Sequence, residues 1–359
     1  MNNLTNINID EFTTLIKPNK LREMLPLNNS IKELVIKTRK SIEDILSGKS
    51  NKKIFIVGPC SIHNIDSAKK YGDELKKISN LVEDKILIVM RVYFEKPRTT
   101  VGWKGLINDP HLDNTYDINY GLSIARELLI YLNDIGLPCG CEFLDVVTPQ
   151  YISDLISWGA IGARTVESQV HRQMVSGMSM PVGFKNSTSG SIKIASDAIL
   201  SAMHKHCFMG ITDNGEPAIC KTKGNKNCHV ILRGGDKPNY DVESVSNAIN
   251  ILKKNNNNEK IMIDCSHGNS GKDYKKQSKV FNNIINQIKG GNNNIIGIML
   301  ESNINEGNQK LIINENNKSN KNELKYGVSI TDSCISIDNT KKIILQSYID
   351  LPTVRNFFY

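Results

Sequence analysis

The sequence predicts an α/β protein folded as a closed (β/α)8 barrel, a TIM barrel, with an N-terminal extension and an inserted β-hairpin. Three observations lead to this fold class. Short β-branched runs alternate with longer helical patterns after Gly48, which is typical of a parallel sheet covered on both faces. Eight strand–helix units remain when one hairpin is set aside, and eight is the number that a barrel needs. Polar side chains also follow the ends of the strands, and in a barrel these ends share one face.

The first 50 residues precede the barrel. Apolar residues recur there at helical spacing, from Ile31 through Val35 and Ile42 to Leu46, and this pattern predicts helix. We therefore divide the chain into an N-terminal extension, residues 1–50, and a barrel, residues 51–359.

Nine apolar runs predict strands, and helical patterns lie between most of them. The runs span residues 54–58, 86–92, 139–143, 160–164, 181–185, 207–211, 229–233, 261–264 and 295–300. The helical patterns span residues 67–78, 121–132, 149–157, 192–205, 242–253 and 274–288. The stretch 218–233 leaves no room for a helix and carries the turn sequence GNKN, so it predicts the inserted hairpin. An open, doubly wound sheet is the alternative, but there only the strands at the switch point would bring their polar ends together.

Composition excludes several classes of protein. The chain has 45 Lys and Arg against 37 Asp and Glu, a net charge of +8. The excess lysine lies in Asn/Lys-rich stretches such as 253–258 rather than in a basic stripe with aromatic residues, so we expect no nucleic-acid partner. Eight cysteines without a regular framework argue against a disulfide scaffold. No apolar run reaches the about 18 residues of a membrane span, and the N-terminus lacks the pattern of a signal peptide. We therefore expect a cytoplasmic protein with no membrane partner.

Basic residues gather at the predicted strand ends. They are Arg91, Lys96, Arg98, Arg164, Lys185 and Arg233. Each alone could pair with a carboxylate or lie on the outer surface. Six cations on one rim would repel one another unless anions occupied the space, and arginine suits phosphate and carboxylate. The set therefore predicts an anionic ligand, and two phosphorylated substrates would explain so many cations.

Soft and hard metal donors follow strands at the same end. Cys60, His267, Glu301 and Asp332 together would form a mixed sulfur, nitrogen and oxygen site for a divalent ion. Their spacing does not establish that they meet, because they lie on separate strands. A buried cysteine and a hydrogen-bonded histidine remain the alternative.

Seven segments carry a resemblance to a known family. They are GPCSIH at 58–63, MRVYFEKPRTTVGWKG at 90–105, GARTVESQ at 162–169, PVGFKN at 181–186, ILRGG at 231–235, DCSH at 264–267 and SITD at 329–332. In this order they resemble the class I, microbial 3-deoxy-D-arabino-heptulosonate-7-phosphate (DAHP) synthases, from about residue 17 to 337. The match departs after residue 309, where an Asn/Lys-rich segment is longer than in the family.

The resemblance implies an enzyme that condenses phosphoenolpyruvate with D-erythrose 4-phosphate and water to give DAHP and phosphate. This is the first step of the shikimate route to aromatic amino acids. One divalent metal ion, Mn, Fe, Co or Zn, would be held by Cys60, His267, Glu301 and Asp332. The substrate-binding residues would be Arg91, Lys96, Arg98, Thr99, Glu142, Arg164, Lys185 and Arg233, with Arg98 and Thr99 on the phosphate of erythrose 4-phosphate.

The catalytic residues would be Lys96, Cys60 and His267. In the condensation, negative charge develops on the aldehyde oxygen, and Lys96 can supply a proton or a hydrogen bond there. Glu142 and the metal ion remain alternatives for activating the attacking water. A Schiff-base aldolase that uses Lys96 or Lys185, a non-catalytic binding barrel and a nucleic-acid binder stay as rival functions.

The resemblance also implies regulation by an aromatic amino acid. In relatives, a segment like residues 1–50 helps to form an inhibitor pocket with a neighbouring subunit, so we interpret it as a regulatory or oligomerisation extension to a catalytic barrel, residues 51–359. A homodimer or homotetramer is expected. Residues 206–210 resemble a wall of that pocket. Phenylalanine-sensitive relatives tend to carry Ser at the position of Gly210, and tyrosine-sensitive ones Gly, so the prediction is inhibition by tyrosine, with phenylalanine as the alternative.

Overall fold

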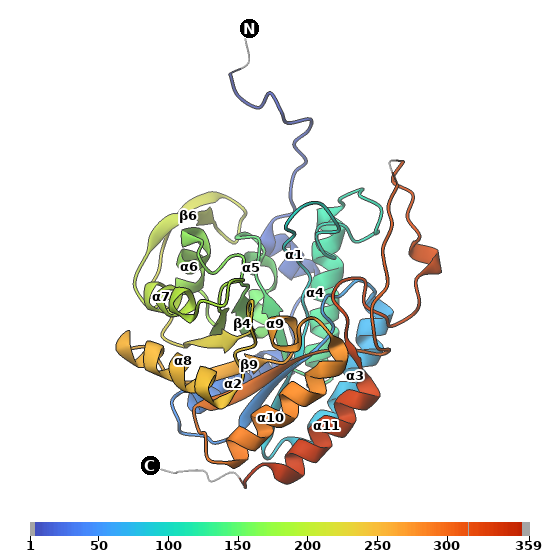
Figure 1. The fold of residues 1–359 in the computed structure, drawn as a ribbon. Helices are drawn as coiled ribbons and strands as arrows, with labels where there is room; N and C mark the ends of the chain where they lie inside the picture. The colour runs from blue at the N-terminus through green and yellow to red at the C-terminus, as the bar shows by residue number, and fades with distance from the viewer. Residues whose placement is uncertain (1–3, 315, 354–359) are drawn as a thin grey trace.

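Eight parallel strands close into a barrel, which confirms the predicted fold class (Figure 1). The computed structural model describes residues 4–314 and 316–353; the other residues of the two predicted parts, 1–50 and 51–359, lie outside that description. The barrel strands are β1 (Lys53–Gly58), β2 (Ile86–Arg91), β3 (Cys139–Glu142), β4 (Ile156–Ile161), β5 (Val182–Lys185), β8 (Cys228–Leu232), β9 (Ile261–Asp264) and β10 (Ile295–Asn303). They pair in this order, and β10 pairs with β1, so the ring is closed and has no free edge.

Helices pack around the ring between the strands. They are α3 (Ile65–Val82), α4 (Ile118–Asp134), α5 (Pro149–Ile152), η1 (Ser153–Leu155), α6 (Gln169–Ser176), α7 (Ile192–Ala202), α8 (Val242–Lys254), α9 (His267–Ser270), η2 (Tyr274–Lys276), α10 (Gln277–Lys289) and α11 (Ile337–Asp350), the last preceded by the short strand β11 (Ile335–Ser336). The short helix η3 (Lys321–Glu323) lies apart from them, in the segment after residue 309. Side chains that accept a backbone N–H cap several of them, for example Asn64 at α3 and Asp241 at α8.

The fourth barrel strand begins earlier than predicted. It starts at Ile156, whereas we expected a strand at 160–164, and the helix expected at 149–157 is only the single turn α5 followed by η1. Ser157 and Gly159 interrupt the apolar pattern of this run. Ser157 is nevertheless fully buried, and a β-carbon on Gly159 would lie 3.3 Å from a methyl carbon of Val182. Small residues here permit close strand packing, but they interrupt the apolar run by which a strand is recognised in the sequence.

The inserted hairpin also lies earlier than the predicted 218–233. It consists of β6 (Cys207–Ile211) and β7 (Pro217–Lys221), which pair antiparallel outside the ring. The turn between them is closed by hydrogen bonds between Thr212 and Glu216, and Gly215 has φ 72°, a conformation that favours glycine. The run that we assigned to the second half of the hairpin is the barrel strand β8.

The N-terminal extension contains two helices, α1 (Pro18–Met24) and α2 (Asn29–Leu46). The end of α2 inserts Ile42, Ile45 and Leu46 into a buried cluster with barrel residues such as Trp158 and Met262. These side chains close the amino-terminal end of the ring. Residues 4–15 run away from the barrel and are largely exposed (Figure 1).

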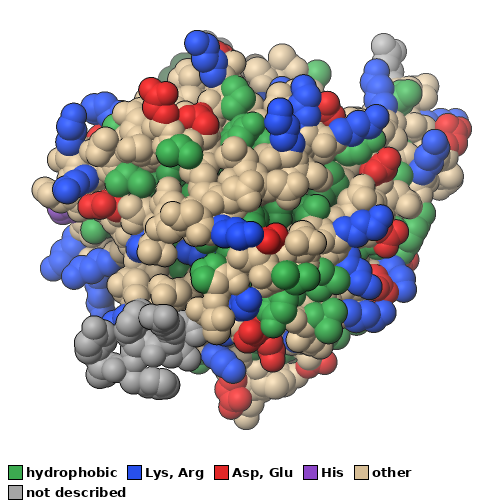
Figure 2. Space-filling model, turned by 60° about the horizontal axis from the view of Figure 1, so that its bottom comes forward, with side chains coloured by type: hydrophobic (Ala, Val, Ile, Leu, Met, Phe, Trp, Pro, Cys, Tyr) green, Lys and Arg blue, Asp and Glu red, His purple; other side chains and the backbone are tan. Residues whose placement is uncertain are grey.

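The Asn/Lys-rich segment after residue 309 forms an arm that projects beside the carboxyl-terminal end of the barrel (Figure 1). Lys321 ties it to the loop before α4, because its ammonium donates to the carbonyl of His111 at 2.9 Å and lies 3.2 Å from Asp113. Figure 2 shows lysine and arginine side chains scattered over the visible face with acidic ones among them. Within the described residues, no helix is long and apolar enough to cross a bilayer.

Candidate active site

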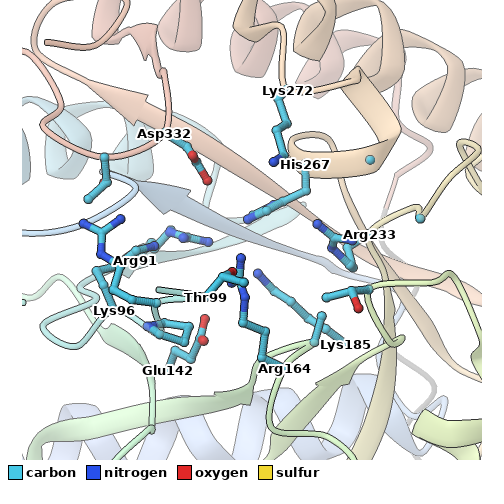
Figure 3. Close-up of a pocket in the computed structure, with 18 residues that line it drawn as sticks. Arg91, Lys96, Thr99, Glu142, Arg164, Lys185, Arg233, His267, Lys272 and Asp332 are labelled. Atoms are coloured by element: carbon cyan, nitrogen blue, oxygen red, sulfur yellow. The ribbon is translucent and has the colours of Figure 1, made fainter. Parts of the chain in front are cut away.

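One cavity of about 580 Å³ opens at the carboxyl-terminal end of the barrel strands. Basic side chains point into it from several strand ends (Figure 3). The predicted site residues that line it are Arg91, Lys96, Arg98, Thr99, Glu142, Arg164, Lys185, Arg233, His267 and Asp332. This is the face at which barrel enzymes bind their substrates, because loops from every strand meet there.

Arg91 ends β2 and is almost completely buried at the base of this cavity. Its Nη2 donates to Glu301 Oε1 at 2.9 Å and to the carbonyl of Cys60 at 3.2 Å. The guanidinium carbon lies 3.7 Å from the centre of the Tyr93 ring. Its Nη1 is buried without a hydrogen-bond partner in the described structure. Because an unpaired buried donor is costly, this nitrogen is available to an anion that enters the cavity.

Asp264, at the end of β9, links two of the predicted residues. Its Oδ2 lies 3.3 Å from Lys185 Nζ and 2.9 Å from His267 Nδ1. Burial would raise the pKa of Asp264, but His267 and Lys185 together hold this pKa well below its usual value. The carboxylate therefore stays ionised and orients both neighbours. With Nδ1 held in this way, the other ring nitrogen of His267 faces Glu301, with Nε2 3.8 Å from Oε1.

The backbone at His267 is unusual. Its φ is 54°, a left-handed conformation that is strained for a residue with a side chain. The next residue is Gly268, where a β-carbon would lie 2.7 Å from the backbone nitrogen of Gly235. Two loops thus approach too closely for any other residue, and this approach places His267 over the cavity. Strain of this kind clusters at functional sites.

Most of the predicted cations have no carboxylate partner. Arg91 and Lys185 form ion pairs, while Lys96, Arg98, Arg164 and Arg233 form none with the described residues. Arg98 is held by its backbone neighbour instead, since its Nε donates to the carbonyl of Trp103 at 2.7 Å. Burial lowers the pKa of Arg233, so its charge is poorly solvated. Excess positive charge around a concave site favours anionic ligands.

Three of the predicted metal donors lie together. One donor atom from each of Cys60, Glu301 and Asp332 lies within 4.8 Å of the other two. His267 is outside this group but next to it, through its 3.8 Å approach to Glu301. Burial would raise the pKa of Asp332, but Lys96 and His267 lower it. A thiol, two carboxylates and an imidazole are a donor set that fits a borderline divalent ion, so the residues fit the predicted metal.

Lys96 lies against this group. Its Nζ is 3.3 Å from both the sulfur and the carbonyl oxygen of Cys60. Burial would lower the pKa of Lys96, but Cys60 and Glu301 raise it above its usual value. The side chain is therefore a retained ammonium that can donate a proton or a hydrogen bond beside the donor group.

Comparison with known proteins identifies the family of the chain. The model of the DAHP synthetase I family matches residues 28–345. The chain belongs to the DAHP synthetase I family. A relative from Escherichia coli (strain K12), "Phospho-2-dehydro-3-deoxyheptonate aldolase, Phe-sensitive", is 50% identical over 340 residues, 95% of each chain. Another from the same strain, "Phospho-2-dehydro-3-deoxyheptonate aldolase, Tyr-sensitive", is 47% identical over 348 residues, 97% of this chain and 96% of the relative.

A solved structure extends the similarity to the fold. "Structure of Phospho-2-dehydro-3-deoxyheptonate aldolase from Francisella tularensis SCHU S4" superposes with a TM-score of 0.91 at 50% identity and covers 96% of this chain and 98% of that chain. The predicted family and class of enzyme are thus confirmed.

Within this DAHP synthetase I family member, one predicted residue belongs neither to the cavity nor to the adjoining group of Cys60, Glu301 and Asp332. Gly210 is on β6 of the hairpin, where a β-carbon would meet the Cys220 sulfur at 2.8 Å. It is predicted as an inhibitor contact rather than a substrate contact.

Sequence reasoning missed three side chains of this site. Asp264 belongs to the DCSH segment and ends a strand, which was a usable signal. Tyr93 lies under Arg91, with the Lys185 ammonium 5.9 Å from its ring centre. Lys272 lines the cavity from the loop after α9. Nothing in the local sequence distinguishes Lys272 from the other lysines of the Lys-rich stretch that follows His267.

Proposed function

We propose that this member of the DAHP synthetase I family condenses phosphoenolpyruvate with D-erythrose 4-phosphate and water to give DAHP and phosphate, the first step of the shikimate route. The observation that carries the proposal is that one cavity brings unpaired cations to Asp332, whose carboxylate lies within 4.8 Å of donor atoms of the buried Cys60 and Glu301. Both substrates carry phosphate, and phosphoenolpyruvate adds a carboxylate. The excess of cations suits them together better than it suits one simple sugar.

Phosphoenolpyruvate is assigned to the inner cations. Arg91 offers its unpaired Nη1, and Lys185 is oriented by Asp264. Arg164 and Arg233 also point into the cavity (Figure 3) and complete the set, and they lie near enough for the charge of Arg164 to lower the pKa of Arg233, after burial as the main cause. Arg98 and Thr99, on the loop after β2, are assigned to the phosphate of erythrose 4-phosphate. This division puts the two reacting carbons between Lys96 and the inner arginines.

A divalent ion would be held by Cys60, His267, Glu301 and Asp332. When bound, it supplies Lewis-acid stabilisation for oxygen atoms that gain negative charge. Burial and the neighbouring Glu301 raise the pKa of the Cys60 thiol, so the apo site favours the protonated thiol. Loading of the ion must therefore release that proton, which makes metal affinity rise with pH.

Lys96 acts on the aldehyde oxygen of erythrose 4-phosphate. As the enol carbon of phosphoenolpyruvate attacks the aldehyde carbon, the ammonium gives this oxygen a hydrogen bond and then a proton. Water adds to C2 of the former phosphoenolpyruvate and the C–O bond to phosphate breaks. Glu142, which is buried at the end of β3 and lines the cavity, is placed to take a proton from that water. Arg164, Lys185 and Arg233 retain the phosphate while it leaves.

A two-substrate assay tests the function. Phosphoenolpyruvate should disappear, and inorganic phosphate should form, only when erythrose 4-phosphate is present. Consumption of phosphoenolpyruvate alone would contradict the proposal. Trapping of a carbonyl substrate on Lys96 or Lys185 by borohydride would support the Schiff-base rival instead.

The metal assignment has its own test. Chelation should abolish activity and an added divalent ion should restore it. His267→Ala should lose bound metal, measured by elemental analysis, while circular dichroism stays that of the wild type. His204→Ala, which changes an exposed histidine far from the cavity, should keep its metal. Full activity in protein shown to be metal-free would refute the assignment.

Regulation by an aromatic amino acid is the finer part of the proposal. Inhibition by tyrosine is favoured over phenylalanine because tyrosine-sensitive relatives tend to carry Gly at the position of Gly210. Residues 1–50 would serve this regulation and the assembly of a homodimer or homotetramer, since the exposed segment 4–15 carries apolar side chains such as Ile7 and Phe12. A cytoplasmic location stays a prediction of the sequence.

Titration of activity with each amino acid tests the inhibitor preference. Gly210→Ser should weaken inhibition by tyrosine. The new side chain would meet the sulfur of Cys220, so the matched variant Gly210→Ser with Cys220→Ala relieves that contact and separates inhibitor fit from hairpin distortion. Stronger inhibition of the wild type by phenylalanine would overturn the preference. Sedimentation of the full chain would establish its oligomeric state.

A further inference from the structure

Glu95 is a buried carboxylate that the reaction above does not use. It lies in the segment after β2, directly before Lys96, and is only 2% exposed. Its Oε1 accepts hydrogen bonds from the backbone N–H of Asp145 at 3.1 Å and from the hydroxyl of Thr148 at 3.2 Å. Its Oε2 accepts one from the backbone N–H of Leu144 at 3.3 Å. All three donors belong to the loop that follows β3.

The surroundings of Glu95 hold no compensating cation. Among the described residues it forms no salt bridge, and the titratable groups that face it are Asp145 on the loop and Cys141 on β3. Burial raises the pKa of Glu95 to about 8, although the hydrogen bonds from Asp145, Leu144 and Thr148 lower it. A buried carboxyl that lacks a counter-charge opposes folding in its ionised form. Simple structural stability therefore does not explain it.

The loop 144–148, which donates hydrogen bonds to Glu95, also makes a hydrogen bond with His171. The ring of His171, on α6, hydrogen-bonds with Nε2 to the carbonyl of Leu144 at 2.7 Å and with Nδ1 to the hydroxyl of Ser168 at 2.9 Å. Hydrogen bonds thus connect residues 144–148 both to Glu95, in the segment after β2, and to His171, on the helix α6 that follows β4. Lys96 directly follows Glu95, and Glu142 ends β3 two residues before Leu144.

We propose that Glu95 is a positioning residue that fixes the separation of Lys96 and Glu142 by binding the loop 144–148. The inference rests on the function proposed above, in which Lys96 donates to the aldehyde oxygen and Glu142 takes the proton from water. Misplacement of a reacting group by about 1 Å can cost about 10²-fold in rate. Three hydrogen bonds to one carboxylate form a rigid enough contact to prevent such a shift.

The main test is Glu95→Gln, which keeps the size of the side chain. The amide can accept with its oxygen, but its NH₂ group faces a donor where the carboxylate had a second acceptor. We expect kcat to fall about tenfold or more, with a smaller change in the KM of phosphoenolpyruvate. The wild-type kcat should rise with pH through about 8, as Glu95 ionises, and this rise should be absent in Glu95→Gln.

A second pair of variants addresses the same contact without changing Glu95. Thr148→Val removes one donor and should lower kcat, whereas Thr148→Ser retains the hydroxyl and should restore most of it. The double variant Glu95→Gln with Thr148→Val should lower kcat by less than the product of the two single fold-decreases, because both substitutions remove the same hydrogen bond. This pair keeps the test decisive if Glu95→Gln does not fold.

The control is Asp109→Asn. Asp109 is also buried and accepts backbone N–H groups, from Asp113 and Asn114, but it does not line the cavity. It should lose stability without a change in the pH profile of kcat. Wild-type kcat and pH profile in Glu95→Gln or in Thr148→Val would overturn the inference. If the wild type itself fails to condense the two substrates, the proposed function fails instead.

Discussion

The two ends of the barrel are made by the same eight strands but differ in almost every chemical respect. At the amino-terminal end, the close of α2 seals the ring with Ile42, Ile45 and Leu46 against an apolar cluster. At the carboxyl-terminal end, cations without partners and the carboxylate of Asp332 line a cavity, next to the buried donors Cys60 and Glu301 and the unpaired Arg91 nitrogen. One end satisfies its groups internally, and the other leaves them for a ligand.

This difference separates the contributions of the two ends to stability and to chemistry. Burial of apolar side chains stabilises the closed end by about 25 cal/mol for each Å² removed from water. Unpaired charges at the open end oppose folding until anions enter. Substitutions at the open end should therefore change kinetics at little cost in stability, and those at the closed end should do the reverse.

The largest kinetic effect is expected from Lys96→Met at the open end. Removing the ammonium that stabilises the developing alkoxide should lower kcat by about 10²–10³-fold. The free energy of unfolding should stay near that of the wild type, because the cation is held among groups that do not depend on it for packing. Lys69→Met, which removes a lysine of α3 outside the cavity, is the kinetic control. An unchanged kcat with a raised KM would show that Lys96 only binds.

The largest stability effect is expected from Ile42→Ala at the closed end. Loss of a buried branched side chain should lower the free energy of unfolding by about 2–5 kcal/mol. Denaturant titration measures it, and kcat at 25 °C should change little. Ile36→Ala on the same helix is the matched control, because Ile36 is 67% exposed. If kcat falls as strongly as stability, the two ends are coupled and the contrast between them fails.

A moderate effect is expected from Arg164→Ala. This arginine is exposed at the rim and has no carboxylate partner among the described residues, so its loss should raise the KM of phosphoenolpyruvate about tenfold. The change in kcat should be smaller. Arg172→Ala alters an arginine of α6 that does not line the cavity and should leave this KM near the wild-type value. A loss confined to kcat would move Arg164 from binding to catalysis.

The smallest effect concerns the layer between the two ends. His229 is fully buried, accepts from Trp158 Nε1 at 3.0 Å, and burial lowers its pKa to about 4. His229 therefore binds a proton near pH 6.5 in the unfolded chain but stays neutral at this pH in the folded protein. This group removes roughly 1 kcal/mol of stability as the pH falls from 6.5 to 5.5. His229→Gln should lack this component in unfolding curves measured at both pH values, and an equal pH slope in the two proteins would disprove it.

Much of the fold follows from local sequence. Apolar runs located seven of the eight barrel strands because parallel strands covered on both faces are continuously apolar, although the run of β8 was assigned to the hairpin. The bounds of the fourth strand were predicted wrongly because Ser157 and Gly159 interrupt its apolar run. The bounds of the hairpin were predicted wrongly because the tight turn at Gly215 resembles the other polar stretches of the sequence. Such positions are determined by neighbours distant in the chain.

The candidate site divides in the same way. Cys60, Arg91 and Glu301 could be found because each lies in or just after a strand of the ring. The hydrogen bond from Thr148 to Glu95 could not be predicted from the sequence, because it depends on how the loops after β2 and β3 pack against each other in the folded barrel. Residue types and strand ends predict which groups share a face, while their hydrogen-bond partners depend on tertiary packing.

The pairing of β1 with β10 has a further consequence for how the protein is made. It joins Gly58 to Glu301, so the first barrel strand waits for the last before the ring can form. A ribosome must therefore release nearly the whole chain before Cys60 and Glu301 become neighbours. Contacts of such long range slow folding. Capture of a divalent ion during synthesis would thus report completion of the ring, and nascent chains that end before β10 should bind the ion no better than the unfolded protein.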